Sequence, residues 1–256
     1  MMSNGNCFVK NLPEGLDVFY DETLYYGIYH PVVFKNKKGE SLIHSEPPCF
    51  FDSWDGITPL LFSKKGAVRM MRLKQDDALT DAEKIHEYDR FTCGGHGVDS
   101  RFEYGVLKWN GKGFDTVVQF GEYESIQPIN PDGYALVMRM DFGGKKIFPD
   151  NIEYGVANFD EGLKFTIEIG KHPHLLCVTD KNMVCFSDIK NRQSGSAHYG
   201  VLDVNNNIVM KPIMGQAEAN LFARGKSNSG RSLDQAAIDK LIEEHNQVYI
   251  YSESRG

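Results

Sequence analysis

A His–Pro–His sequence lies at His172-Pro173-His174, and Cys177 follows three residues later. In an extended strand the two histidines would face the same side, where imidazole nitrogens can bind zinc or copper. However, Pro173 and the preceding Gly170-Lys171 are typical of a surface turn, and two ligands without a third do not specify a metal. We therefore expect a surface loop and no bound metal or cofactor, with His172 and His174 as the alternative metal ligands.

A second group of reactive residue types occurs between Cys93 and Asp99, where Cys93, His96 and Asp99 are separated by glycines. A cysteine, a histidine and an aspartate can form a nucleophile with its base. Catalytic triads assemble from distant segments, whereas these residues share one short loop, so a glycine-rich helix exit is the favoured interpretation. The common hydrolase, zinc-protease, Walker and dinucleotide motifs are absent from the sequence. A non-enzymatic protein is therefore favoured, with an enzyme using His172, His174 and His96 as the alternative.

The composition indicates a folded, cytoplasmic protein. The 256 residues are 41% hydrophobic and carry a net charge of −7. Short lysine pairs in expected turns do not form a nucleic-acid surface, and no apolar run reaches the roughly 18–20 residues that a membrane-spanning helix needs. The first seven residues lack the basic and apolar parts of a signal peptide. The five cysteines are odd in number and irregularly spaced, which favours reduced thiols over a disulfide framework.

The elements that would position these residues follow a weakly repeated phrase. An aromatic residue and a glycine begin a strand, a polar turn follows, a second strand returns, and an acidic residue with glycine begins the next unit. The clearest copy is Tyr104-Gly105-Val106-Leu107, the turn Asn110-Gly111-Lys112, the strand Thr116–Phe120 and the pair Asp132-Gly133. Asn, Asp and Gly tolerate the positive φ of tight hairpin turns. The phrase therefore predicts antiparallel β-hairpins.

Weaker copies begin near Tyr26, Leu136, Leu175 and Tyr199, with turns expected at residues 36–39, 141–144, 180–182 and 205–207. A single hairpin cannot bury its apolar face, so neighbouring copies must stack. The predicted fold class is therefore mainly all-β, built of stacked antiparallel β-hairpin repeats with two short helices, one of which caps the C-terminus.

This phrase resembles the WG (KWG) repeat, a bacterial β-hairpin repeat, between about Tyr26 and Ile213. The consensus tryptophan before glycine is a tyrosine at Tyr26, Tyr104 and Tyr199. The resemblance implies an all-β array that is used for protein binding, and it transfers no catalytic residue.

Two helices are expected outside the hairpins. Thr80-Asp81-Ala82-Glu83 and Ser232-Leu233-Asp234-Gln235 both have the form of a capping box. The second opens an amphipathic helix with one apolar face, and Gln247–Tyr251 is predicted to be a final strand. We thus expect a repeat domain at residues 1–223, a flexible polar linker at 224–231 and a helix–strand cap at 232–256. The apolar face consists of Leu233, Ile238, Leu241 and Ile242.

Aromatic and acidic residues between Cys49 and Asp55 suggest a binding surface. Aromatic side chains anchor protein interfaces, and Pro47-Pro48 argues against a regular strand here. The expected partner-binding residues are Phe50, Phe51, Asp52, Trp54, Asp55, Asp76 and Asp77. The sequence therefore predicts a protein-binding module with a protein partner, for example an immunity protein that blocks a basic toxin domain. A self-associating structural protein is a further alternative, and no nucleic-acid or membrane partner is expected.

Overall fold

The computed structural model describes residues 9–20, 30–42, 49–51, 60–73, 102–141, 151–187 and 198–253. The fold is mainly β, with antiparallel hairpin-like strands, as the sequence predicts, and these ranges also contain two helices. None of the helices in this part of the chain is long and apolar enough to cross a bilayer. The expected helix after Thr80 lies outside the described residues.

The chain forms two compact units, and the division falls inside the range 1–223 that was predicted as one domain. The first unit comprises residues 1–133 together with 158–163, and the second comprises 134–157 and 164–256. A short piece of chain from the middle of the second unit's sequence therefore belongs to the first.

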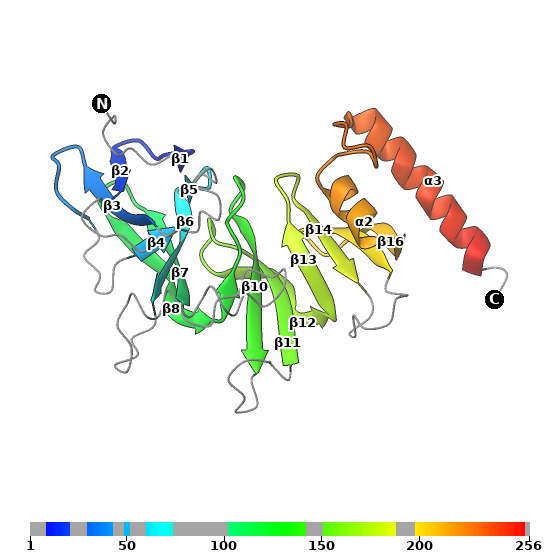
Figure 1. Ribbon diagram of the computed structural model, residues 1–256, viewed down its shortest axis with the longest axis horizontal. Helices are drawn as coiled ribbons and strands as arrows, with labels where there is room; N and C mark the ends of the chain where they lie inside the picture. The colour runs from blue at the N-terminus through cyan, green and yellow to red at the C-terminus, as the bar shows by residue number, and fades with distance from the viewer. Residues whose placement is uncertain are drawn as a thin grey trace. The chain divides into compact units, whose positions relative to one another are not determined.

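A six-stranded antiparallel sheet forms most of the first unit (Figure 1). Its order is β2-β3-β4-β6-β7-β8. These strands are β2 (Leu16–Tyr20), β3 (His30–Asn36), β4 (Cys49–Phe51), β6 (Ala67–Leu73), β7 (Phe102–Trp109) and β8 (Phe114–Tyr123). The short strands β1 (Val9–Lys10) and β5 (Leu60–Leu61) pair in parallel, and β9 (Ser125–Ile126) follows β8. The core of this unit is aromatic and aliphatic, with Phe34 and Phe62 fully buried.

Residues 158–163 complete the first unit through hydrogen bonds. The Ser63 hydroxyl donates to the carboxylate of Asp160, which is buried. Lys108 Nζ donates to the backbone carbonyl of Asp160 at 2.5 Å, and the backbone N–H of Phe159 donates to the Gly133 carbonyl at 2.8 Å. The hydroxyl of Ser63 provides the buried carboxylate with a hydrogen-bond donor, and without such a donor the carboxylate would carry a large desolvation penalty.

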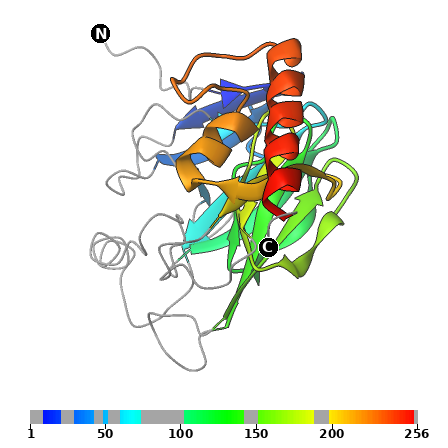
Figure 2. The ribbon, with the colours of Figure 1, turned by 90° about the vertical axis from the view of Figure 1, so that its right-hand side faces the viewer.

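The second unit contains two sheets and both described helices. Three of its strands follow the order β12-β11-β10, and four others follow the order β13-β14-β15-β16. Figure 2 shows the two helices in front of the sheet that ends with β16. The elements are β10 (Tyr134–Asp141), β11 (Asn151–Asn158), β12 (Lys164–His172), β13 (His174–Val178), β14 (Met183–Ser187), β15 (Tyr199–Asp203), β16 (Ile208–Met214), α2 (Gln216–Ala223) and α3 (Gln235–Glu253).

One kind of turn recurs in both units. Between β15 and β16, the N–H of Asn206 donates to the Asp203 carbonyl at 3.1 Å, and the Asp203 carboxylate accepts from the N–H of Asn207 at 2.8 Å. Asn206 has a φ of 70°, as expected for a type I turn followed by a left-handed residue. Equivalent turns begin at Asn36, Ser63, Thr179 and Ser227, with Gly39, Gly66, Asn182 and Gly230 in the left-handed position. The turns that the sequence predicts at residues 36–39, 180–182 and 205–207 are thus confirmed.

Three Tyr–Gly pairs share a local structure as well. Tyr104, Tyr154 and Tyr199 are all buried. A Cβ atom on the glycine after each tyrosine would lie within 3 Å of a neighbouring strand: 2.9 Å from the Phe120 ring at Gly105, 2.8 Å from Ile169 at Gly155 and 2.5 Å from the Met210 carbonyl at Gly200. Glycine in a strand often marks such a close approach. These close approaches explain why a glycine follows each of the three tyrosines.

The C-terminal region differs from the sequence-based prediction in three respects. Gln247–Tyr251 is not a strand, because α3 continues to Glu253. Asp234 rather than Ser232 caps α3, since its carboxylate accepts from the N–H of Ala237 at 2.8 Å. Residues 224–231 were expected to be flexible, yet the N–H of Ser227 donates to the Arg231 carbonyl at 2.8 Å in an ordered turn.

Candidate functional site

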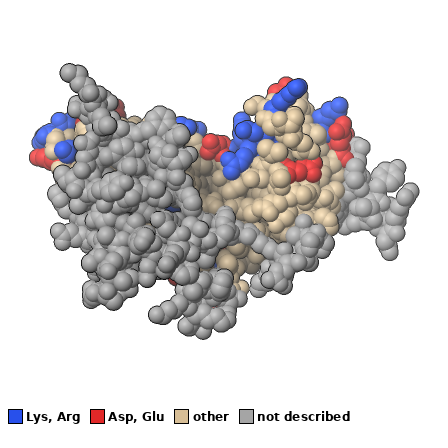
Figure 3. Space-filling view, viewed as in Figure 1, with Lys and Arg blue, Asp and Glu red and all other residues tan. Residues whose placement is uncertain are grey.

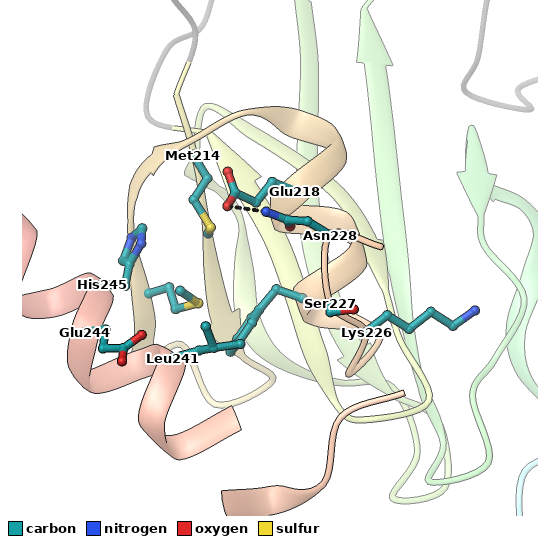
Figure 4. Close-up of a pocket in the computed structure, with 10 residues that line it drawn as sticks. Met214, Glu218, Lys226, Ser227, Asn228, Leu241, Glu244 and His245 are labelled. Atoms are coloured by element: carbon teal, nitrogen blue, oxygen red, sulfur yellow. Dashed lines mark hydrogen bonds between the residues drawn. The ribbon is translucent and has the colours of Figure 1, made fainter. Parts of the chain in front are cut away.

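A pocket of about 340 Å³ lies in the second unit between β16, α2, the turn that begins at Ser227, and α3. Its volume is in the range of small-ligand sites, roughly 300–1,000 Å³. Figure 4 shows the side chains that line it, which come from all four of these segments. They are Met210, Met214, Glu218, Phe222, Lys226, Ser227, Asn228, Leu241, Glu244 and His245.

The inner wall of the pocket is apolar. Met210 and Met214 lie four residues apart on β16, so both project from the same face of the strand. Phe222 of α2 joins them, and all three side chains are at most 5% exposed. They belong to the core that the two helices cover, in which Ile238 of α3 is also buried. Leu241, one turn further along α3, is 36% exposed and forms the outer apolar wall.

The mouth of the pocket is acidic. Glu218 on α2 and Glu244 on α3 are both exposed. The Asn228 side-chain amide donates to Glu218 at 3.1 Å, a bond drawn in Figure 4. Lys240 lies 3.6 Å from Glu244 in an exposed pair, which binds weakly in water. Lys226 extends away from the other lining side chains in Figure 4, so its charge is directed outwards.

His245 adds a polar group to the wall formed by α3. Its Nε2 lies 3.1 Å from the backbone carbonyl of Lys211. Because a carbonyl oxygen can only accept, Nε2 is the donor in this hydrogen bond. The pocket therefore combines an apolar interior with carboxylates and a histidine. Such a lining suits the binding of a partly apolar group that has a hydrogen-bond donor.

The two histidines of the His–Pro–His sequence lie in strands. His172 ends β12, and its Nε2 lies 2.6 Å from Oδ1 of Asn206. His174 begins β13 and is 4% exposed, with its ring 5.1 Å from that of Tyr154 and 6.4 Å from that of Tyr199. The surface-loop prediction is therefore wrong for His174, because β12 and β13 continue to either side of Pro173. Among the described residues, no three His, Cys, Asp or Glu side chains are grouped as metal ligands would be.

Two cysteines lie side by side beneath α2. Cys177 of β13 and Cys185 of β14 are directly paired across the antiparallel strands, and both are free thiols. Burial raises the pKa of the Cys185 thiol from 9.0 to about 12, and the neighbouring Cys177 adds to this effect. Burial also raises the pKa of Cys177, although Arg224 opposes the shift. Cys185 belongs to the core, as expected from its apolar surroundings in the sequence.

The predicted partner-binding residues are only partly within the described ranges. Phe50 and Phe51 lie in β4, where Phe50 is paired with Pro31 of β3 and with Met71 of β6. The expectation that Cys49–Asp55 contains no regular strand is thus wrong for Cys49–Phe51. The other predicted residues, with the Cys93–Asp99 group, lie outside the described residues: Asp52, Trp54, Asp55, Asp76, Asp77 and His96.

Sequence reasoning did not identify the pocket. It placed Leu241 on the apolar face of α3, with Leu233, Ile238 and Ile242, and the structure confirms that Ile238 is buried. The sequence offered one signal, the apolar Leu241 on the face of α3. The second helix of the pocket, α2, was not expected, so nothing indicated that Leu241 would line a pocket.

Figure 3 shows acidic and basic side chains gathered near the end of the second unit's sheet where the hairpin turns lie, with uncharged surface beside them. Comparisons of the chain with protein-family models, curated proteins and solved structures find no match.

Proposed function

We propose that this chain is a non-enzymatic protein-binding module, and that the pocket between α2 and α3 is part of its contact surface. The observation that carries the proposal is the open, largely apolar pocket with Leu241 exposed at its edge. Anchoring side chains of a partner commonly fill such pockets, and the surrounding polar residues then exclude water.

The partner that suits this surface is basic. The chain has a net charge of −7, and Glu218 and Glu244 place two carboxylates at the mouth of the pocket. Opposite charge speeds diffusional encounter and disfavours partners of like charge. A concrete form of the proposal is a cytoplasmic immunity protein that neutralises a toxin by covering a basic surface of the toxin.

Acidic residues that follow β4 and β6 in the sequence form a second proposed contact. Asp52 and Asp55 follow this strand in the sequence, and Asp76 and Asp77 follow β6. Reversal of charge at Asp52 and Asp55 should slow association with a basic partner, because electrostatic steering acts mainly on the association rate.

Affinity capture from the source cells tests the proposal. The wild-type chain should recover one dominant, basic protein in stoichiometric amount, and Leu241→Gln should weaken its binding about tenfold or more. Ile208→Gln is the matched control, since Ile208 is 58% exposed in the same unit but does not line the pocket. Recovery of no stoichiometric partner would contradict the proposed function. If the chain pairs only with itself, its size in solution would instead support a self-associating structural protein.

A further inference from the structure

We propose that the pocket between α2 and α3 receives an apolar side chain of the partner, and that a positively charged group beside it contacts Glu218 and Glu244. This inference rests on the proposed protein-binding function and specifies the chemistry of the residue that is bound. The occupant is thus an aromatic or branched apolar residue of a basic protein, with a lysine or arginine next to it.

The inner wall of the pocket is apolar and its mouth is charged. This difference determines which end of the occupant enters first. Met210, Met214 and Phe222 are nearly inaccessible, whereas Glu218 and Glu244 are exposed. An arginine that entered head first would place its guanidinium against the thioethers and the ring, far from both carboxylates, at a desolvation penalty. An apolar group that enters first instead leaves the cation at the mouth.

The inner wall suits an aromatic group in particular. Methionine side chains are flexible and polarizable, and their sulfur atoms contact aromatic rings favourably. Two of them, together with Phe222, line the inner wall. Lys226 points away, and the exposed pair between Lys240 and Glu244 is weak, so the carboxylates at the mouth favour a cation over an anion of the same shape.

Two small probes with the same skeleton separate charge from shape. The 2-phenylethylammonium ion and the 3-phenylpropionate ion share a ring and a two-carbon linker but carry opposite charges. Titration of the full chain, observed at the methionine methyl groups by NMR, should shift the signals of Met210 and Met214. These signals are assigned with Met210→Leu and Met214→Leu. The ammonium ion is expected to bind more tightly than the carboxylate.

The double variant Glu218→Gln/Glu244→Gln removes both charges without changing the shape of the side chains. It should weaken binding of the ammonium ion about two- to tenfold, the range expected for exposed ion pairs, and it should not weaken binding of the carboxylate. Glu243→Gln is the control for the loss of a carboxylate charge from α3, because Glu243 lies outside the pocket lining.

Equal or tighter binding of the carboxylate by the wild-type chain would overturn the inference, and so would the absence of a shift at both methionines with either probe. The same double variant in the capture experiment separates the two proposals. A partner that is retained unchanged by the variant would leave the protein-binding function standing and refute the pocket assignment. The absence of any partner would refute the function, whatever the probes show.

Discussion

The cores of the two units differ in their share of aromatic and sulfur-containing side chains. In the first unit, the Phe34 ring packs edge-on against Phe62 and Phe114, with centroid distances of 6.2 and 4.9 Å, and Met70 is also buried there. In the second unit, the core under the helices contains Cys185 and two methionines, together with alanines of α2 and the rings of Tyr199 and Phe222. Aromatic rings have few rotamers and directed contacts, whereas methionine adapts to gaps.

This difference affects how readily each core can repack around a bound group. Interlocked rings leave little freedom to admit another group without unfolding their neighbours. Small and flexible side chains beneath α2 and α3 can repack around an occupant at low energetic cost. The first core therefore stabilises its sheet, while the second core also provides a surface that can adapt.

The largest expected effect is on the first core. Phe34→Ala should lower the free energy of unfolding of this unit by about 3–5 kcal/mol, because a fully buried ring leaves a cavity. Met210→Leu, the comparison in the second unit, should cost less than about 1.5 kcal/mol. Both tryptophans of the chain, Trp54 and Trp109, belong to the first unit, so their fluorescence during denaturant unfolding measures the loss for Phe34→Ala, while circular dichroism of the whole chain measures the loss for Met210→Leu. If Phe34→Ala lowers the free energy of unfolding by less than about 1.5 kcal/mol, the two cores do not differ in their tolerance of substitution.

The rate at which the Cys185 thiol is alkylated shows whether the second core opens while the first remains folded. Its thiol should resist alkylation by iodoacetamide at pH 8, because the pKa raised to about 12 leaves little thiolate. An unfolded chain loses this proton near pH 9, so stability present below about pH 9 should be lost as the pH rises towards 12. Peptide mapping by mass spectrometry measures the alkylation. Modification at the rate of the unfolded chain, with native tryptophan fluorescence, would show that the core opens locally.

The stability of glycine-to-alanine variants reports how closely neighbouring strands approach each other in the two units. A Cβ at Gly200 would lie 2.5 Å from the Met210 backbone carbonyl, which cannot move without the strand. Gly200→Ala should therefore destabilise the second unit by about 1–3 kcal/mol. At Gly105 the Cβ would meet the Phe120 ring, a partly buried side chain that can turn aside, so Gly105→Ala should cost less. Thermal unfolding of both variants measures the two losses of stability. Equal losses for Gly200→Ala and Gly105→Ala would contradict the expected order.

The smallest expected effect concerns the hairpin turns. The left-handed turn position is Gly39 or Gly66 in the first unit, but Asn182 or Asn206 in the hairpins of the second. Asn206→Gly keeps the backbone conformation and loses the bond to His172, whereas Asn206→Ala also introduces a left-handed alanine. Alanine should be about 1 kcal/mol worse than glycine. If both variants unfold at the same temperature, the turn imposes no left-handed constraint.

The turns and the fold class could be predicted because their signals are local. The side chains of Asn36 and Asp203 accept hydrogen bonds from the backbone N–H groups of the turns that they begin, and Gly39 and Asn206 adopt the positive φ. Each turn therefore marks the ends of two strands without reference to the rest of the chain.

The errors arise where local signals are weak or are overridden. Gln247–Tyr251 has the residue types of a strand, yet it continues the helix that precedes it. The start of α2 could not be recognised, because Gly215 provides no side-chain cap. The pocket needs four separate segments to be brought together, and no spacing in the sequence reports that arrangement.

The contribution of residues 158–163 to the first unit affects the order in which the chain can be completed during translation. Asp160, the partner of Ser63, leaves the ribosome 97 residues after it, when β10 and β11 have already been made. The first unit therefore cannot finish folding as soon as its own continuous segment has been synthesised. A gene truncated after Gly133 would yield a fragment that lacks its closing segment, so the units are not separable by a single cut.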